Sequence, residues 1–272
     1  MKFAFIKTIL PLLFTFFVVA SFFSCSEQDI EAVPTAGLTK ISEGYALGAA
    51  AKVEVWAEEE LFAGYNPLYF ALYDSVTGQA ITDSHIHINS IMNMQTMSHS
   101  CPVEEPESEA VNKLFSAAVL FTMPSGDMGS WKLETKIHNH VNGLFGNASF
   151  DINVKSSTPS QVISFQVSSG ERFYLSYRFP EKQKVGINEF EVIAFTSTDG
   201  KFVPTENLAI KLTPEMPSMD HGSPNNEDPA HVGKGHYKGK ANFTMTGEWR
   251  LQLELATESG VLDKKYFDIV VE

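Results

Sequence analysis

An internal repeat constrains this sequence more than any other feature. Sliding the chain along itself by 122 residues, without a gap, aligns glycines, methionines, a histidine and an aromatic segment. The aligned residues are Gly64 with Gly186, Gly78 with Gly200, Met94 with Met216, Met97 with Met219, His99 with His221, and Phe121-Thr122-Met123 with Phe243-Thr244-Met245. Trp131 aligns with Trp249 once a short insertion is allowed. The chain is therefore predicted to fold as two similar domains in tandem.

Residues 1–24 have the composition of a targeting segment. Lys2 and Lys7 precede an uncharged, mostly apolar run that ends at Ser24-Cys25. Because the run is short for a membrane span, it favours a signal peptide, and an uncleaved N-terminal anchor is the alternative. A small residue followed by cysteine resembles the lipobox of bacterial lipoproteins. The resemblance implies cleavage before Cys25, lipidation of its thiol, and a protein anchored by acyl chains in the bacterial cell envelope.

The segment after Cys25 and the overall charge narrow the partners of the mature protein. Residues 25–42 are polar and without periodicity, which predicts a lipidated tether. The formal net charge is -13, and removal of Lys2 and Lys7 with the signal peptide takes it to -15. A chain this acidic is not expected to bind nucleic acid by neutralising phosphates, whereas it attracts cations. On an outer membrane, the anchored protein would face the periplasm or the cell surface.

Cysteine usage excludes a disulfide framework. The sequence contains two cysteines, so lipidation of Cys25 leaves Cys101 as the one free thiol. No intramolecular disulfide is then possible. Ser223 occupies the position of Cys101 in the second copy, so Cys101 is at most an optional extra metal ligand.

Alternating apolar residues predict strands throughout both copies. The predicted strands are 51–56, 65–73, 84–91, 116–123, 131–137 and 148–154, followed by 162–167, 173–177, 188–195, 208–212, 241–245, 248–255 and 266–271. Short strands, frequent turns and no amphipathic helix are typical of an all-β protein with two tandem immunoglobulin-like β-sandwich domains. The expected boundaries are 43–157 for the first domain and 158–272 for the second.

A long irregular loop that begins with the Met/His residues is predicted in each copy. In the second copy it covers residues 213–240, which are rich in proline and glycine. A long loop inside a compact domain is usually functional or disordered. Methionines and a histidine open both loops, so the loops are the first place to look for a site.

The paired methionines and histidines form a set of soft metal ligands. The candidate ligands are Met94, Met97, His99 and Met123 in the first copy and Met216, Met219, His221 and Met245 in the second. Thioether sulfur prefers Cu(I), and imidazole extends the range towards Cu(II) and Zn(II). The sequence therefore predicts copper, as Cu(I), at these residues. The alternative is packing, since methionine commonly fills cores, and this alternative is strongest for Met123 and Met245.

The remaining histidines have no partner in the repeat. His85 and His87 alternate along one predicted strand, as do His138 and His140 at the end of another. Two histidines at this spacing can chelate a metal, but placement on the surface is the favoured interpretation. His231 and His236 fall in the second loop and are interpreted as solvated or, at most, auxiliary ligands. The acidic run 104–109 is likewise interpreted as a solvated loop.

Longer motifs carry a family resemblance. In the second copy they are Met216-Pro217-Ser218-Met219-Asp220-His221, the segment Gly235 to Gly239, and the segment Phe243 to Trp249. Both copies resemble YtkA-like, FixH-related domains, which are small β-sandwiches of bacterial envelopes. The first copy departs from the pattern at Gln95, Phe115 and Ala117. The resemblance implies the sandwich fold and a role in handling copper, and it implies no reaction chemistry.

Two function classes follow. Since the sequence contains no nucleophile elbow, phosphate-binding glycine loop or zinc-protease motif, we do not expect an enzyme. The first hypothesis is an envelope lipoprotein that binds Cu(I) through its Met/His loops for sequestration, efflux or delivery to an envelope protein partner. The alternative is a non-catalytic interaction or adhesive surface lipoprotein, in which the Met-rich loops contact a partner.

Overall fold

Strands dominate the computed structural model, which describes residues 32–258 and 260–272. The predicted signal peptide, Cys25 and the start of the tether lie outside the described residues. The first half contains β1 (Thr39–Ala46), η1 (Leu47–Ala49), β2 (Ala51–Ala57), β3 (Gly64–Asp74), β4 (Ala80–Ile81), β5 (Ser84–Asn93), β6 (Ser98–Ser100), β7 (Val103–Glu104), β8 (Phe115–Phe121), β9 (Ser130–Asn139) and β10 (Leu144–Ile152). The second half contains β11 (Val162–Gln166), β12 (Arg172–Arg178), β13 (Gly186–Thr198), β14 (Lys201–Pro204), β15 (Ala209–Met216), η2 (Pro217–Met219), β16 (His221–Gly222), β17 (Glu227–Gly233), β18 (His236–Phe243), β19 (Gly247–Thr257) and β20 (Gly260–Val271). Within these ranges, no helix is long and apolar enough to cross a membrane.

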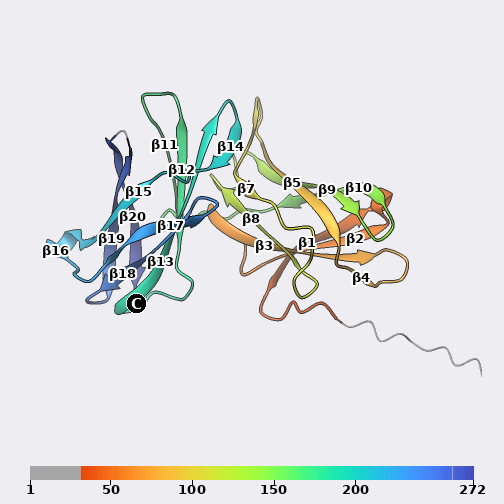
Figure 1. The fold of residues 1–272 in the computed structure, drawn as a ribbon, viewed down its shortest axis with the longest axis horizontal. Helices are drawn as coiled ribbons and strands as arrows, with labels where there is room; N and C mark the ends of the chain where they lie inside the picture. The colour runs from red at the N-terminus through yellow and green to blue at the C-terminus, as the bar shows by residue number, and fades with distance from the viewer. Residues whose placement is uncertain (1–31, 259) are drawn as a thin grey trace, which may run out of the picture. The chain divides into compact units, whose positions relative to one another are not determined.

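The two halves have the same topology, strand for strand. One sheet of the first half has the order β1-β2-β3-β8-β7, with β4 paired to β3, and the other has the order β10-β9-β5-β6. The second half repeats both orders with each strand number raised by ten: β11-β12-β13-β18-β17, with β14 on β13, and β16-β15-β19-β20. Figure 1 shows the first set in colours from red to light green and the second in colours from green to blue. The prediction of an all-β fold with two tandem β-sandwiches is confirmed, and the immunoglobulin-like subtype stays a prediction.

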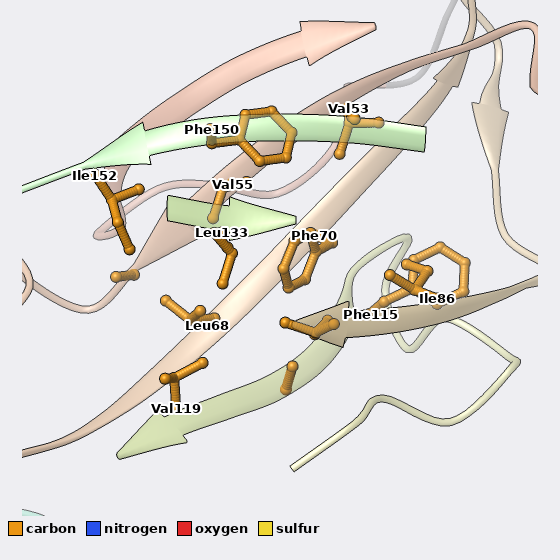
Figure 2. Packing of buried hydrophobic residues seen from close by; sticks show 14 of the residues in the cluster. Val53, Val55, Leu68, Phe70, Ile86, Phe115, Val119, Leu133, Phe150 and Ile152 are labelled. Atoms are coloured by element: carbon orange, nitrogen blue, oxygen red, sulfur yellow. The ribbon is translucent and has the colours of Figure 1, made fainter. Parts of the chain in front are cut away.

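Alternation along the strands builds each core. In β19, Trp249, Leu251, Leu253 and Leu255 are buried, while the residues between them reach the surface. Figure 2 shows the result in the first sandwich, where side chains from both sheets meet in one buried layer. The labelled residues are Val53, Val55, Leu68, Phe70, Ile86, Phe115, Val119, Leu133, Phe150 and Ile152. Burial of this apolar layer, at about 25 cal/mol per Å², is the main stabilising contribution to each sandwich.

Short edge strands account for the differences between prediction and structure. The prediction of an irregular loop over residues 213–240 is wrong, because this segment contains the end of β15, then η2, β16 and β17, and the start of β18. Proline and glycine misled the prediction, since Pro214 and Pro229 lie within strands β15 and β17. Proline is tolerated on edge strands such as β17. Strand β1 also begins at Thr39, before the predicted end of the tether at residue 42.

A small second cluster joins the two sandwiches, which belong to one compact unit from Ala32 to Glu272. Tyr65, Ala118 and Leu120 of the first pack with Ile193 and Phe195 of the second. The Tyr65 amide N–H also donates to Ser176 Oγ at 3.1 Å. Each sandwich has its own core, but separating them would expose this apolar surface.

A partly buried ionic contact borders that cluster. His236 of the second sandwich contacts Glu104 at 2.8 Å through Nε2 and Glu191 at 3.0 Å through Nδ1. The Tyr65 hydroxyl donates to the same Glu104 at 3.1 Å. The interpretation of His236 and of the acidic run 104–109 as solvated loop residues is therefore wrong for His236 and Glu104. The repeat hid the contact, because the 122-residue shift aligns Glu104 with Asn226 and His236 with Leu114.

The two carboxylates set the protonation of this histidine. Burial by itself lowers the pKa of His236, but the hydrogen bonds and charges of Glu104 and Glu191 outweigh burial and raise the pKa to about 9. Burial also raises the pKa of Glu191, yet contact with His236 holds that pKa below its usual value. The imidazolium form therefore stabilises the contact between the sandwiches.

This contact predicts a stability that falls with rising pH. An unfolded histidine has a pKa of about 6.5, so the contribution of His236 is complete below that pH and is lost as the pH passes through about 9. The free energy of unfolding of wild type, measured in urea, should fall by on the order of 1–3 kcal/mol between pH of about 6.5 and about 9, relative to that of His236→Gln. His231→Gln, at an exposed histidine of β17, is the matched control and should follow wild type. Parallel pH profiles for wild type and His236→Gln would contradict the assignment.

Candidate metal centres

A tight hairpin forms the tip of the second sandwich, where β16 projects (Figure 1). Met216 is the last residue of β15 and pairs with His221, the first residue of β16. Between them, Pro217 opens the short 3-10 helix η2, and Asp220 closes it with φ +50°. Proline fixes the backbone at the start of such a turn, and aspartate tolerates the left-handed conformation at its end. The Pro-Ser-Met-Asp segment thus brings His221 back beside Met216.

Trp249 organises the residues around this hairpin. Its buried indole N–H donates to the Met245 carbonyl at 3.0 Å. The His221 ring lies 6.4 Å from the indole, centroid to centroid, at an interplanar angle of 61°. His221 Nε2 also contacts Thr244 Oγ1 at 3.1 Å. Met216, His221 and Met245 thus lie around one tryptophan, and Met219 lies two residues before His221 in the chain.

The first sandwich repeats this arrangement at its own tip. The Trp131 indole donates to the Met123 carbonyl at 2.9 Å. The His99 ring meets the indole edge to face, at 5.7 Å and 90°. His99 pairs across the hairpin with Met92, and Met92 pairs on its other side with Trp131. The histidine, the tryptophan and the methionine carbonyl thus occupy equivalent positions in both copies.

The structure corrects one equivalence drawn from the repeat. Met92, and not Met94, is the counterpart of Met216, because each pairs with the hairpin histidine. A Cβ on Gly129 would lie 3.2 Å from the Met92 Cε, and one on Gly247 would lie 3.0 Å from the Met216 Cε. The turn of the first hairpin is longer by two residues, and it is closed by the Met94 N–H donating to the Met97 carbonyl at 2.9 Å. An ungapped comparison cannot detect two residues added within a turn.

Exposure divides the candidate methionines into two groups. Met216 is 4 % exposed in the second core, whereas Met219 on η2 is 59 % exposed. Met97 is 63 % exposed at the first tip, and Met94, Met123 and Met245 are partly buried against the cores. Burial gives Met216 a packing role. The exposed thioethers of Met97 and Met219, each close in the chain to a hairpin histidine, are free to bind a ligand.

The surroundings of the first tip differ in charge. His99 and Met123 line an open groove of about 630 Å³, together with Arg172, Tyr174 and Phe202 of the second sandwich. A cation bound at the first tip would share this groove with a guanidinium, which disfavours it electrostatically.

Cys101 does not extend the ligand set of the first tip. It lies in the first core and is 2 % exposed. Burial raises the pKa of its thiol to about 12. Because thiolate and not thiol is the metal-binding form, Cys101 acts as a small apolar core residue.

A third group of ligands was missed by the sequence analysis. His85, His138 and His140 place one ring nitrogen each within 4.8 Å of one another. Sequence spacing gave the pairs 85/87 and 138/140, but His87 instead contacts the carboxylate of Glu105. The signal that would have found the group is strand register, since His85 lies directly opposite His138.

The fold and the tips define a class: a tandem β-sandwich protein with a Met/His/Trp hairpin on each domain. Within that class, residues 173–254 match the model of the YtkA-like family, so this part of the second sandwich is a YtkA-like domain. The resemblance predicted for the second copy is thereby confirmed. The match does not cover the first sandwich, which repeats the topology of the second. Among curated proteins, none matches the chain.

Several solved structures are similar to this chain at low sequence identity. It is similar to the Yersinia pseudotuberculosis adhesin InvE, at 12 % identity over 84 % of this chain and 62 % of that one, with a TM-score of 0.27. A conserved domain protein from Bacillus anthracis matches at 11 % identity over 88 % of this chain and 92 % of that one, with a TM-score of 0.29. Domains 5–6 of the S-layer protein SbsC match at 10 % identity, over 86 % and 98 %, with a TM-score of 0.24. The chain thus spans less than two thirds of the InvE chain, and scores of this size carry no functional argument.

The division into buried and exposed methionines predicts unequal effects on stability. Met216→Ala removes a buried side chain and should lower the free energy of unfolding by about 2–4 kcal/mol. Met219→Ala changes an exposed residue three positions away and should stay within about 0.5 kcal/mol of wild type. Urea unfolding measures both, and Met92→Ala against Met97→Ala repeats the comparison in the first sandwich. Equal losses within either pair would refute this assignment of roles.

Proposed function

We propose that this protein binds Cu(I) at the tips of its two sandwiches, in the bacterial cell envelope, to sequester the ion, support its efflux or deliver it to a protein partner. One observation carries the proposal: both tips hold an exposed methionine within two residues of a histidine that packs against a buried tryptophan. This combination occurs twice although the turns between the strands differ in length. Packing explains the buried methionines, but it does not explain the exposed ones.

The chemistry of the donors favours Cu(I) over other ions. Thioether sulfur is soft and uncharged, so it binds Cu(I) well and hard divalent ions poorly. An imidazole beside it adds one borderline donor. The indole next to each histidine supplies an apolar wall, which keeps water and oxygen ligands away from that side. A site of two thioethers and one imidazole would therefore select a monovalent soft ion.

The ligand sets follow from exposure and from the convergence on the tryptophans. In the second sandwich we assign Met219 and His221 as ligands and Met245 as the third donor, with Met216 packed beneath them. In the first sandwich we assign Met97, His99 and Met123, with Met94 as a further donor on the same turn. Because Arg172 lines the groove at the first tip, the second site is expected to bind more tightly.

The proposed location and partners fit this chemistry. Lipidation at Cys25 would anchor the protein to the membrane through acyl chains. The acidic mature chain would attract cations and repel nucleic acid. We propose no catalytic activity, since the YtkA-like domain and the tips supply ligands without a nucleophile and its base. The protein that gives or takes the ion would be another component of the envelope.

The exposed methionines also favour a second candidate function. Met97 and Met219 could instead contact a protein partner, as part of a non-catalytic interaction or adhesive surface. In that case the thioethers would act through their apolar surface, and leucine would replace them without loss. The two candidates therefore differ in their response to Met→Leu.

The test is Cu(I) binding under reducing, anaerobic conditions, measured by competition with a chromophoric Cu(I) chelator. Wild type should bind two ions per chain. Met219→Leu should weaken the second site at least tenfold and leave the first unchanged, and Met97→Leu should do the reverse, so each variant controls the other. Met216→Leu keeps the core filled and should change binding less than threefold. Unchanged binding when both exposed methionines are replaced, or no binding by wild type, would contradict copper binding and favour the partner surface.

A further inference from the structure

The group His85, His138 and His140 lies at the far end of β5 from the first tip. His85 is the second residue of β5 and Met92 the ninth, so the group and the tip are roughly 23 Å apart along the strand. His138 lies opposite His85 on β9, and His140 follows the end of β9. None of these residues belongs to the ligand sets assigned above, so an inference drawn from them stands apart from the copper proposal.

Three rings face one another at this position. His85 Nδ1 lies 2.7 Å from His140 Nε2. The ring centroids of His138 and His140 are 4.6 Å apart, and those of His85 and His140 are also 4.6 Å apart. One ring nitrogen from each residue can be chosen so that all lie within 4.8 Å of one another. Histidines that only occupy a solvated surface have no reason to bring their ring nitrogens together in this way.

Neighbouring groups hold two of the rings in place. Asp83 Oδ1 contacts His140 Nδ1 at 2.5 Å, which orients the ring and leaves Nε2 directed at the other histidines. Phe145 stacks on His138 at 3.9 Å, with an interplanar angle of 9°. A carboxylate on the outer nitrogen of a histidine is the usual support of a metal-binding imidazole, because it fixes the tautomer and raises the basicity of the ligand.

We propose that His85, His138 and His140 form a binding site for a borderline divalent ion, Zn²⁺ or Cu²⁺, with Asp83 supporting His140. Imidazole nitrogen suits these ions. Nitrogen ligands about 2.0–2.1 Å from a tetrahedral ion are roughly 3.3 Å apart, so the ion would replace the hydrogen bond between His85 and His140 with a small outward shift. His85 is exposed and the other two are half-exposed, which leaves a fourth position for water or an exogenous ligand.

The chemistry of this site differs from that of the tips. Three imidazoles supply no thioether, so the site selects divalent ions and not Cu(I). Two charged residues lie nearby. Asp83 contacts His140 and favours a bound cation, and Lys136 pairs with His87 on β9, two residues before His138. Zinc alone is therefore the decisive probe, because the thioether tips bind it poorly.

The experiment is equilibrium dialysis of the whole protein against Zn²⁺ alone, with the bound metal measured by elemental analysis. Wild type should retain one zinc ion. His85→Ala and His140→Ala should each lower the affinity at least tenfold, and Asp83→Asn should lower it by about tenfold. His87→Ala is the matched control, since His87 lies on the same face of β5 but pairs with Glu105, and it should bind as wild type does.

Copper supplies the second readout. Cu²⁺ bound to wild type should give an electron paramagnetic resonance spectrum with superhyperfine splitting from three nitrogens, and His85→Ala should reduce it to two. Circular dichroism checks that each variant is folded, which is expected because His85 is exposed. Failure of wild type to retain Zn²⁺, unchanged zinc affinity in His140→Ala, or an equal loss in His87→Ala would overturn the site.

Discussion

The buried indoles of Trp131 and Trp249 are the interaction on which each tip depends. Both side chains are 1 % exposed or less. A buried indole N–H must find an acceptor, and in both sandwiches it finds the carbonyl of the methionine that follows β8 or β18. The same indole lies in a core cluster that contains a buried methionine, and it meets a histidine ring. Core packing thus fixes the position of the residues that we propose as ligands.

The contact between the two sandwiches cannot be symmetric unless a two-fold axis relates them. Without such an axis, each copy of a tandem duplication contacts the other through a different surface. Here the contact pairs Glu104 of one copy with His236 of the other, and strand register places Glu227 and Leu114 at the equivalent positions, so the histidine has no counterpart. The asymmetric pair shows that the copies diverged where they meet. The two tips kept the same histidine and tryptophan.

The sequence predicted the architecture well because alternation is strong in the long strands. Side chains from Trp249 to Leu255 point alternately into the core and towards the surface in β19. The same alternating pattern recurs in the other copy of the repeat. Short edge strands such as β6, β16 and β17 could not be predicted, since β6 and β16 are too short to show a period and β17 contains a proline and a glycine. The pairing of His85 with His138 could not be predicted either, because it depends on the register between β5 and β9.

The candidate tips were only partly predictable. The motif gave His221 and Met219 from spacing, but it could not tell that Met216 ends a strand and is buried while Met219 is exposed. The interpretation of Met123 and Met245 as packing residues holds in part, since both lie partly buried against the cores. Their main-chain carbonyls, which hold the indoles, were not foreseen. Any residue type supplies a main-chain carbonyl, so this role cannot be inferred from the sequence.

The central claim is that thioether sulfur and imidazole nitrogen together bind copper at the tips. X-ray absorption at the copper edge of the Cu(I)-loaded protein tests it most directly, because sulfur and nitrogen scatterers are distinguished by distance and amplitude. The account predicts a first shell with one nitrogen ligand and at least two sulfur ligands per copper. A shell of nitrogen and oxygen alone would contradict it.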